Sequence, residues 1–301
     1  MSTAEPKARR RFPGLDASAL QHPYDRAALN ALQKVPGFDI VVRKFIELLP
    51  ERVAYIQNVA QTVRVTSTQC PQLYSQLQEA CAILDIPEPE LYVAHYPLPN
   101  AWTSGHDHPY IIITSGLLDL MTEDEVLAVI AHELGHIKSG HVLYKTMARG
   151  ISFLLTILGE MTLGIGRIVG RSLEAALMEW DRKSEFSADR AAMLVTQDSE
   201  VMVSLMMKLA GGTLFQRDKM NVQEFLKQAD LYEEVDANLL DRLYKFFMVT
   251  SVSHPLIIVR AREIVNWSDS REYSDILEGR YVRSVLAKHR APGKTAVYHD
   301  D

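Results

Sequence analysis

The chain has 301 residues, of which 47% are hydrophobic and 23% charged, which is ordinary for a globular protein and long enough to bury a full core. Its formal net charge of −6 argues against nucleic acid as the main partner. Two cysteines are too few for the disulfide framework of a small secreted domain.

The N-terminal part of the chain divides into two expected segments. Residues 1–21 contain no apolar stretch of the kind found in secretory signals, and we expect them to form a disordered tail. Residues 22–66 predict a helical arm made of two helices that break near Pro36 and Gly37. This arm is expected to pack on the main domain.

The main domain is placed at residues 67–267, with a polar C-terminal tail at 268–301. Its first element is a predicted helix over residues 71–83. Along that helix, Cys70 and Cys81 would lie about 16 Å apart, which no disulfide can span. We therefore expect free thiols and a reducing, cytoplasmic location.

Residues 90–114 are rich in β-branched and aromatic residues and are punctuated by proline and glycine, so they predict a small sheet. An exposed edge of such a sheet can align a peptide by strand addition. His95, His106 and His108 lie in or beside these strands, and we interpret them as turn or surface residues.

Residues 122–142 carry the strongest helix signal of the chain. Thr122 followed by Glu125 is a capping-box pattern, and apolar residues recur behind it at helical spacing. We expect a largely buried helix.

The same stretch has the spacing of a metal site. On a helix His132 and His136 lie about 40° apart on one face, so both imidazoles can bind one zinc ion. Glu133 is then placed to take a proton from a water molecule. His141 lies about 180° around an unbroken helix from His132, so we interpret it as a surface or helix-end histidine.

A third ligand is expected further along the chain. Glu185 and Asp189 are spaced i, i+4 on a second predicted helix, where Glu185 would complete a His, His, Glu site. Asp189 would accept the free ring N–H of a ligand histidine, His132 being the preferred candidate. The alternative is a solvated acidic stripe that pairs with Arg182 and Arg190.

Residues 151–170 are the most apolar stretch of the chain, but Glu160 and Arg167 interrupt it. The uncharged runs on either side are shorter than the about 20 residues that a transmembrane helix needs. Our leading interpretation is a helical hairpin that caps the site or packs in a homo-oligomer. Peripheral membrane contact is the second interpretation.

The remaining part of the main domain is predicted to be helical. Gly211 and Gly212 mark a clear break. Pro255 fits the first position of a further helix, which leaves His254 at the helix entrance.

The ordered set of motifs carries a family resemblance. HELGH, then RKSEFSAD, then His254-Pro255 with Arg260 six residues beyond the histidine, resembles the gluzincin zinc metallopeptidases of the HtpX and CAAX prenyl protease family. The resemblance covers roughly residues 70–265. It implies an α+β fold, mainly α-helical, of the zincin type, with a small mixed β-sheet beside the HExxH helix.

The chemistry that the resemblance implies is peptide-bond hydrolysis in a polypeptide substrate, with one Zn²⁺ per chain. His132, His136 and Glu185 are the expected metal ligands. Glu133 is the expected base, which takes a proton from water and passes it to the leaving amine.

The resemblance also assigns residues around this centre. Asn100, Ala101 and Trp102 resemble the family's edge strand, which would align the substrate. His254 and Arg260 would border the zinc cleft and stabilise the oxyanion of a tetrahedral intermediate. A helix-capping histidine and a surface arginine are the simpler alternative for this pair.

A biological role in protein quality control or processing is expected from the same resemblance. His254 also suggests latency, because a neutral imidazole at that position can serve as a fourth metal ligand when the cleft is shut. The rival function is a catalytically silent, zinc-stabilised module that binds unfolded chains. Glu133 argues against this rival, because a purely structural zinc site needs no base.

Overall fold

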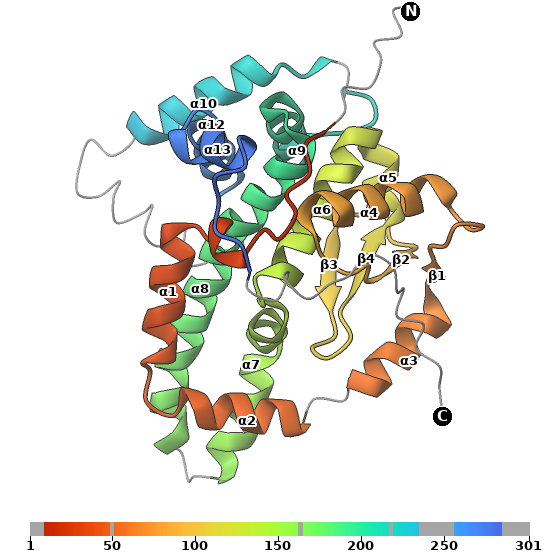
Figure 1. The fold of residues 1–301 in the computed structure, drawn as a ribbon. Coiled ribbons are helices and arrows are strands. Elements are labelled where there is room, and N and C mark those ends of the chain that lie inside the picture. Colours follow the sequence, from red (N-terminus) through yellow and green to blue (C-terminus); the bar gives the residue numbers. More distant parts are fainter. Residues whose placement is uncertain (1–8, 49–50, 162–164, 217–218, 235–255, 285–301) are drawn as a thin grey trace, which may run out of the picture.

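The helices and strands are described here from a computed structural model, which shows a small sheet at one side of a larger set of helices (Figure 1). This arrangement confirms the expected α+β, mainly α-helical class. The residues that the structure describes are 9–48, 51–161, 165–216, 219–234 and 256–284, and the side chains of 152–170 fall outside the description.

The sheet has four strands in the order β1-β2-β4-β3. β2 and β4 pair in parallel, with Leu91 opposite Ile111, whereas β1 and β3 pair antiparallel to their neighbours, so the sheet is mixed as expected. β3 is an edge strand. The strands are β1 Val63–Arg64, β2 Glu90–Ala94, β3 Ala101–Ser104 and β4 Tyr110–Thr114.

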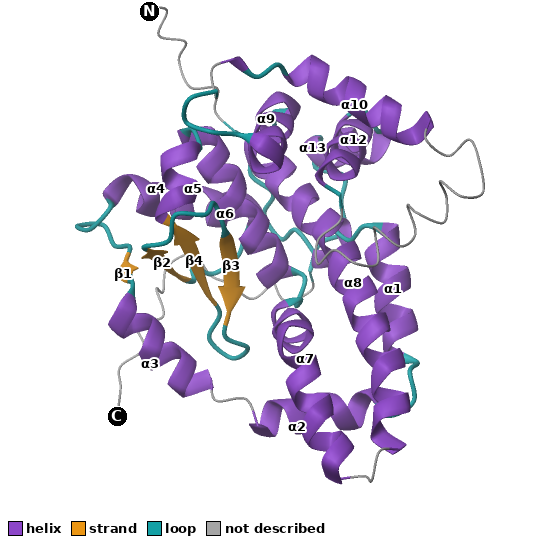
Figure 2. Cartoon of the chain, turned by 180° about the vertical axis from the view of Figure 1, so that it is seen from behind, coloured by secondary structure: helices purple, strands orange, loops and turns teal. Residues whose placement is uncertain are grey.

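Both faces of the central strand β4 are covered, which is why the sequence there is apolar without alternation. Ile111 and Ile113 belong to the main core, together with residues of α4 (Pro71–Leu84), α5 (Ser115–Leu120) and α6 (Glu123–Lys138). On the other face, Tyr110 packs edge-on against Tyr55 of α3 (Glu51–Gln61). Figure 2 shows the sheet between these helices.

Helix α6 begins as expected and packs closely on the long helix α8 (Ile165–Thr196). The capping box is present: the hydroxyl of Thr122 accepts from the Glu125 amide, and the Thr122 amide donates to the Glu125 carboxylate at 2.7 Å. Gly135 permits the close approach, because a Cβ there would lie 2.7 Å from Ala191 Cβ and 3.0 Å from Ala188 Cα. The two helices therefore lie very close together where α6 faces α8.

The apolar stretch 151–170 falls in a helical hairpin, as expected, formed by α7 (Val142–Met161) and α8. The last part of α7 and the first part of α8 lie near α2, far from the end of α8 that packs on α6 (Figures 1 and 2). Among the described residues, no helix is both long and apolar enough to cross a membrane.

The N-terminal arm contains three helices where two were expected. They are α1 (Pro23–Gln33), α2 (Phe38–Leu48) and α3, with the predicted break at Pro36 and Gly37 between the first two. α1 packs along α8, and α2 packs on α7. A second buried cluster joins the arm to the hairpin and includes Leu32, Phe38, Phe45, Met147, Ile151 and Trp180.

The prediction that residues 1–21 form a disordered tail is wrong for residues 9–21. Phe12, Leu15 and Leu20 are buried in the main core, and the Phe12 amide donates to the Ile83 carbonyl at 2.9 Å. These apolar residues have no helical or strand period, so nothing local in the sequence indicated that they were buried.

The C-terminal elements pack on α8 and on one another. The break at Gly211 and Gly212 is confirmed, and the helix expected from Pro255 begins at Ile257. The predicted tail 268–301 is wrong for its first part, where a further helix buries Tyr273 and Ile276. The helices are α9 Ser199–Gly211, α10 Val222–Glu234, α12 Ile257–Ser268 and α13 Arg271–Leu277.

Candidate metal centre and substrate cleft

Three candidate ligands converge between α6 and α8. One ligand atom each of His132, His136 and Glu185 lies within 4.8 Å of the others. His132 Nε2 is 3.4 Å from Glu185 Oε2, and His136 Nε2 is 3.3 Å from Glu185 Oε1. The Nε2 atoms of both histidines thus face the carboxylate of Glu185, although Glu185 comes from a different helix.

The chemistry of these groups fits a zinc ion. Two imidazole nitrogens and one carboxylate oxygen are a frequent ligand set of zinc hydrolases, which keep a fourth position open. Burial lowers the pKa of His132, but Asp189 and Glu185 outweigh burial and raise this pKa to about 9. Carboxylates that stabilise a cationic imidazole so strongly would equally stabilise a divalent cation, whose binding releases that proton.

Asp189 supports His132 as expected. Its Oδ1 lies 3.0 Å from His132 Nδ1, which leaves Nε2 available to a metal ion. Burial opposes ionisation of Asp189, but the adjacent Arg260 and His132 hold its pKa below the ordinary value. The alternative acidic stripe is not what the structure shows, because Arg182 pairs with Glu179 and Arg190 pairs with Glu272.

Arg260 approaches the centre from α12. Its Nε and Nη2 donate to the two carboxylate oxygens of Asp189 at 2.8 and 2.6 Å, and Nη1 lies 3.3 Å from Glu185 Oε2. The guanidinium therefore orients both carboxylates beside the histidines. Its expected partner in oxyanion stabilisation, His254, lies outside the described residues, so that role stays a prediction.

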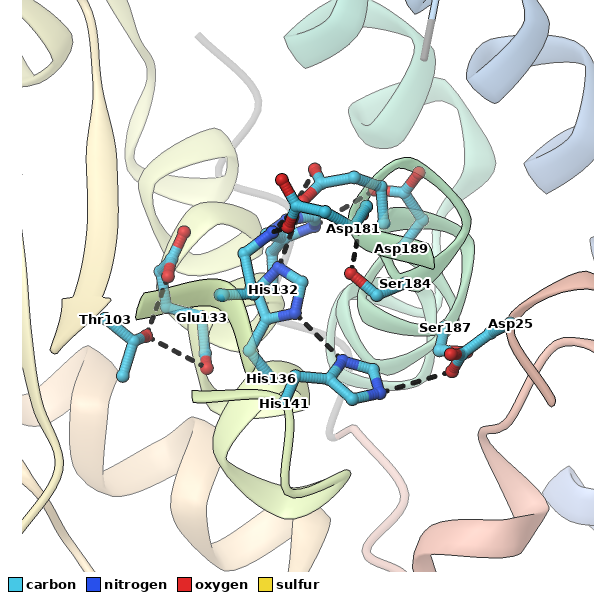
Figure 3. Close-up of polar contacts among 12 residues, drawn as sticks. Asp25, Thr103, His132, Glu133, His136, His141, Asp181, Ser184, Ser187 and Asp189 are labelled. Atoms are coloured by element: carbon cyan, nitrogen blue, oxygen red, sulfur yellow. Dashed lines mark hydrogen bonds and ion pairs between the residues drawn. The ribbon is translucent and has the colours of Figure 1, made fainter. Parts of the chain in front are cut away.

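Glu133 is held by a residue of β3 that the sequence did not single out. Thr103 Oγ1 donates to Glu133 Oε2 at 2.7 Å, and both side chains are buried (Figure 3). Thr103 directly follows the predicted substrate strand, but nothing in the sequence indicated that its hydroxyl contacts α6.

A cleft of about 250 Å³ joins the candidate metal ligands to the sheet edge. Asn100, Ala101 and Trp102 line it, as expected for residues that contact a substrate. Another part of its wall is apolar and comes from α9, whose contribution the sequence did not predict. The α9 residues are Met202, Leu205, Met206 and Leu209.

Some backbone N–H and C=O groups of the edge strand β3 point away from β4. The Thr114 amide donates to the Asn100 carbonyl at 3.0 Å, and Trp102 pairs with Ile112. Since hydrogen-bonding direction alternates along an antiparallel pair, Ala101 and Thr103 direct their backbone groups to the outer edge. The Thr103 carbonyl there accepts from Arg149 Nη1 at 3.3 Å.

Lys145 of α7 is a further charged residue at the centre. Its buried Nζ donates to Glu185 Oε1 at 2.7 Å and to Asp181 Oδ1 at 2.8 Å. Burial lowers the pKa of Lys145, but the two carboxylates outweigh burial and raise it above the ordinary value. A cation on α7 thus pairs directly with the candidate ligand Glu185.

His141 is not the surface residue that the sequence predicted. It does follow the end of α6, but it is only 1% exposed, and its Nδ1 lies 3.1 Å from His136 Nδ1. The prediction assumed an unbroken helix. Instead Gly140, with φ of +70°, ends α6 and turns the chain, so that His141 returns toward the centre.

Comparison with known proteins agrees with this geometry. The model of peptidase family M48 matches residues 67–268. A plastoglobule-localized metallopeptidase 48, chloroplastic, of Arabidopsis thaliana is 37% identical over 280 residues, which cover 92% of this chain and 80% of that protein.

More distant relatives share the central part of the chain. A protease HtpX homolog 2 of Methanosarcina mazei is 29% identical over 169 residues, 49% of this chain and 58% of that protein. A protease HtpX homolog of Dictyoglomus turgidum is 29% identical over 201 residues, 57% of this chain and 66% of that protein. The similarity to these two proteins thus spans roughly six tenths of their length.

Proposed function

The chain belongs to peptidase family M48 and is a metallopeptidase, and we propose that it is an endopeptidase that hydrolyses polypeptides with one zinc ion per chain. The main support for this proposal is the geometry of the cleft. His132, His136 and Glu185 bring their ligand atoms within 4.8 Å of one another there, and Glu133 lines the same cleft. A base beside an open three-ligand site is the arrangement that metal-assisted hydrolysis requires.

Each protein group has a distinct part in the proposed reaction. When bound, zinc polarises a carbonyl and lowers the pKa of water. Glu133 takes a proton from the attacking water and passes it to the leaving amine. The Thr103 hydroxyl keeps the Glu133 carboxylate aimed into the cleft, and the neighbouring Asp189 holds His132 with Nε2 toward the metal.

For the oxyanion we propose His254 together with Arg260, as the motif resemblance suggests. In support, Arg260 lines the cleft and has Nη1 close to Glu185. Its Nε and Nη2 are engaged by Asp189, so its contribution to the oxyanion would come through Nη1.

We propose that the substrate binds as an extended chain along β3. The outward backbone groups of Ala101 can pair with such a chain, and Asn100 and Trp102 line the cleft on either side. The apolar wall from α9 then favours an apolar side chain next to the scissile bond. These features suit unfolded polypeptides, consistent with a role in protein quality control or processing.

The rival function, a silent zinc-stabilised binding module, is not favoured. A structural zinc site is normally closed by four ligands. Here three ligands adjoin a cleft, and a buried hydroxyl orients the adjacent Glu133.

For the location we propose the cytoplasm, on the ground that Cys70 and Cys81 are both free thiols. Peripheral membrane contact through residues 151–170 is the second proposal. Subcellular fractionation decides between them: recovery with membranes that ends on a carbonate wash favours the second, and recovery in the supernatant without a wash favours the first.

The decisive experiment compares Glu133→Gln with Glu185→Ala. The first variant should retain about one zinc per chain and lose cleavage of an unfolded test protein, because Glu133 is a base and not a ligand. The second should lose the zinc as well. Metal content by mass spectrometry and cleavage by gel give both results, and loss of zinc from Glu133→Gln would contradict the assigned role.

A further inference from the structure

The metal centre continues beyond its ligands, into a buried chain of side chains that reaches helix α1. We propose that Asp25 is a positioning residue for the zinc ligand His136 and acts on it through His141. This inference rests on the proposed zinc site and adds two residues to it. Asp25 lies outside residues 67–268, the part of the chain that the family model matches.

The contacts form one continuous path. His136 Nδ1 lies 3.1 Å from His141 Nδ1, and His141 Nε2 lies 3.2 Å from Asp25 Oδ2 (Figure 3). The side chains of all three residues are at most 1% exposed. The path therefore runs through the protein interior. Among the described residues, His141 Nε2 makes no hydrogen bond of good angle, so its approach to Asp25 Oδ2 is a charge contact and not a well-aligned hydrogen bond.

The carboxylate of Asp25, at the end of this path, accepts hydrogen bonds from two other side chains. Trp180 Nε1 donates to Asp25 Oδ1 at 3.0 Å, and Ser187 Oγ donates to Oδ2 at 2.6 Å. Burial opposes ionisation of Asp25, but His141, Ser187 and Trp180 together hold its pKa below the ordinary value. Asp25 is thus a carboxylate surrounded by donors.

The direction of each hydrogen follows from this carboxylate. A carboxylate beside Nε2 favours the neutral tautomer of His141 that carries its hydrogen on this atom, which leaves Nδ1 as an acceptor. His136 must then carry its hydrogen on Nδ1, so that its Nε2 lone pair points toward Glu185, where the ion is expected. The two-step path thus selects the tautomer of His136 that can bind a metal.

The fold makes this path possible although its members are distant in sequence. Gly140 turns His141 back under α6, and α1 lies along α8, which carries both Trp180 and Ser187. The ring of His141 is held edge-on against Trp180 at 5.4 Å between centroids. Helix α1 is therefore part of the metal centre, in addition to its packing role.

The test is the isosteric substitution Asp25→Asn in the full chain. Every orientation of the new amide places its NH₂ against a donor, either Trp180 or the Ser187 and His141 pair. The preference of His141 for the Nε2 tautomer is lost, and with it that of His136. We expect zinc affinity, measured by competition with a chromophoric chelator, to fall by about 10 to 100-fold.

A second readout needs no metal. In ¹⁵N-labelled zinc-free protein, long-range proton–nitrogen spectra report the tautomer of each histidine. The His136 Nε2 resonance should have the shift of an unprotonated nitrogen in the wild type and lose it in Asp25→Asn. A merely structural role of Asp25 would leave this resonance unchanged.

Thr196→Val is the matched control. It removes a buried hydroxyl of α8, which donates to the Ala192 carbonyl at 3.1 Å and takes no part in this path, so zinc affinity should stay within about threefold of the wild type. If Asp25→Asn does not fold, the pair His141→Asn and His141→Leu replaces it. Asparagine retains an acceptor near the Nδ1 position and should keep zinc affinity, whereas leucine should lose it by about 10 to 100-fold.

The outcomes separate the two proposals. A wild-type protein that binds no zinc contradicts the proposed function. A wild type with one zinc, and a folded Asp25→Asn with equal affinity and an unchanged His136 resonance, overturns the positioning role alone. Equal affinities of His141→Asn and His141→Leu would overturn it in the same way.

Discussion

At the scale of single residues, the candidate base is supported from the sheet. Glu133 receives a 2.7 Å hydrogen bond from Thr103 Oγ1, and Arg149 donates to the carbonyl of the same threonine. A carboxylate that must accept a proton from a water at a defined position benefits from such a fixed orientation. The edge strand thus both lines the cleft and orients the candidate base.

The prediction at this scale is that Thr103→Val lowers kcat by about 10 to 100-fold without loss of zinc, because the base loses its orienting donor. Steady-state cleavage of a fluorogenic peptide and metal analysis check it. Thr196→Val is the control, since in the described part of the chain the buried Thr196 hydroxyl bonds only within its own helix, to Ala192 O at 3.1 Å. Equal kcat values for the two variants would show that the Thr103 hydroxyl does not assist catalysis.

At the scale of elements, the α6–α8 contact sets the distance between the histidines and Glu185. Ala188 and Ala191 on α8 leave room for α6 only because Gly135 has no side chain. A ligand set shared by two helices requires this separation to be constant. The close contact therefore serves the chemistry as well as the core.

We predict that Gly135→Ala destabilises the protein by about 1 to 3 kcal/mol through overpacking and weakens zinc binding. Urea unfolding and chelator competition measure the two effects. Gly211→Ala is the control, because a Cβ on Gly211 at the end of α9 meets nothing within 4 Å. That variant should be neutral or more stable by up to about 1 kcal/mol. If Gly135→Ala had the same free energy of unfolding as the wild type, the two helices could move apart without loss of stability, which would contradict the prediction.

At the scale of the whole molecule, the family-matched region is enclosed by segments on either side of it. Residues 9–21 contribute Phe12, Leu15 and Leu20 to the main core, and α13 contributes Tyr273 and Ile276. The isolated bridge between Leu15 and Arg283 joins residues 9–21 to the chain that follows α13. The folded unit is therefore larger than residues 67–267, which the sequence suggested.

The prediction that follows is a stability loss of about 3 to 5 kcal/mol for Phe12→Ala, the cost of emptying a large buried site. Phe215→Ala is the matched control, since Phe215 is 78% exposed, and it should change the free energy of unfolding by less than about 1 kcal/mol. Urea unfolding midpoints of the two variants test this prediction. Similar midpoints would show that residues 9–21 do not contribute to the stability of the core.

The sequence by itself determined those parts of the site that depend on local geometry. The spacing of His132, Glu133 and His136 places them together on any helix, and the i, i+4 spacing of Glu185 and Asp189 does the same on another. The start of α6 and the strands around the substrate edge were likewise local signals.

Only the tertiary structure decided the contacts between elements. Thr103, Lys145 and Asp25 reach the centre from a strand and two further helices, and no spacing along the chain encodes such an approach. His141 was misjudged because one glycine ended the helix on which its direction was calculated. Burial of residues 9–21 depended on the surfaces that other segments offer, since apolar residues without a period reveal their place only once the core that encloses them has formed.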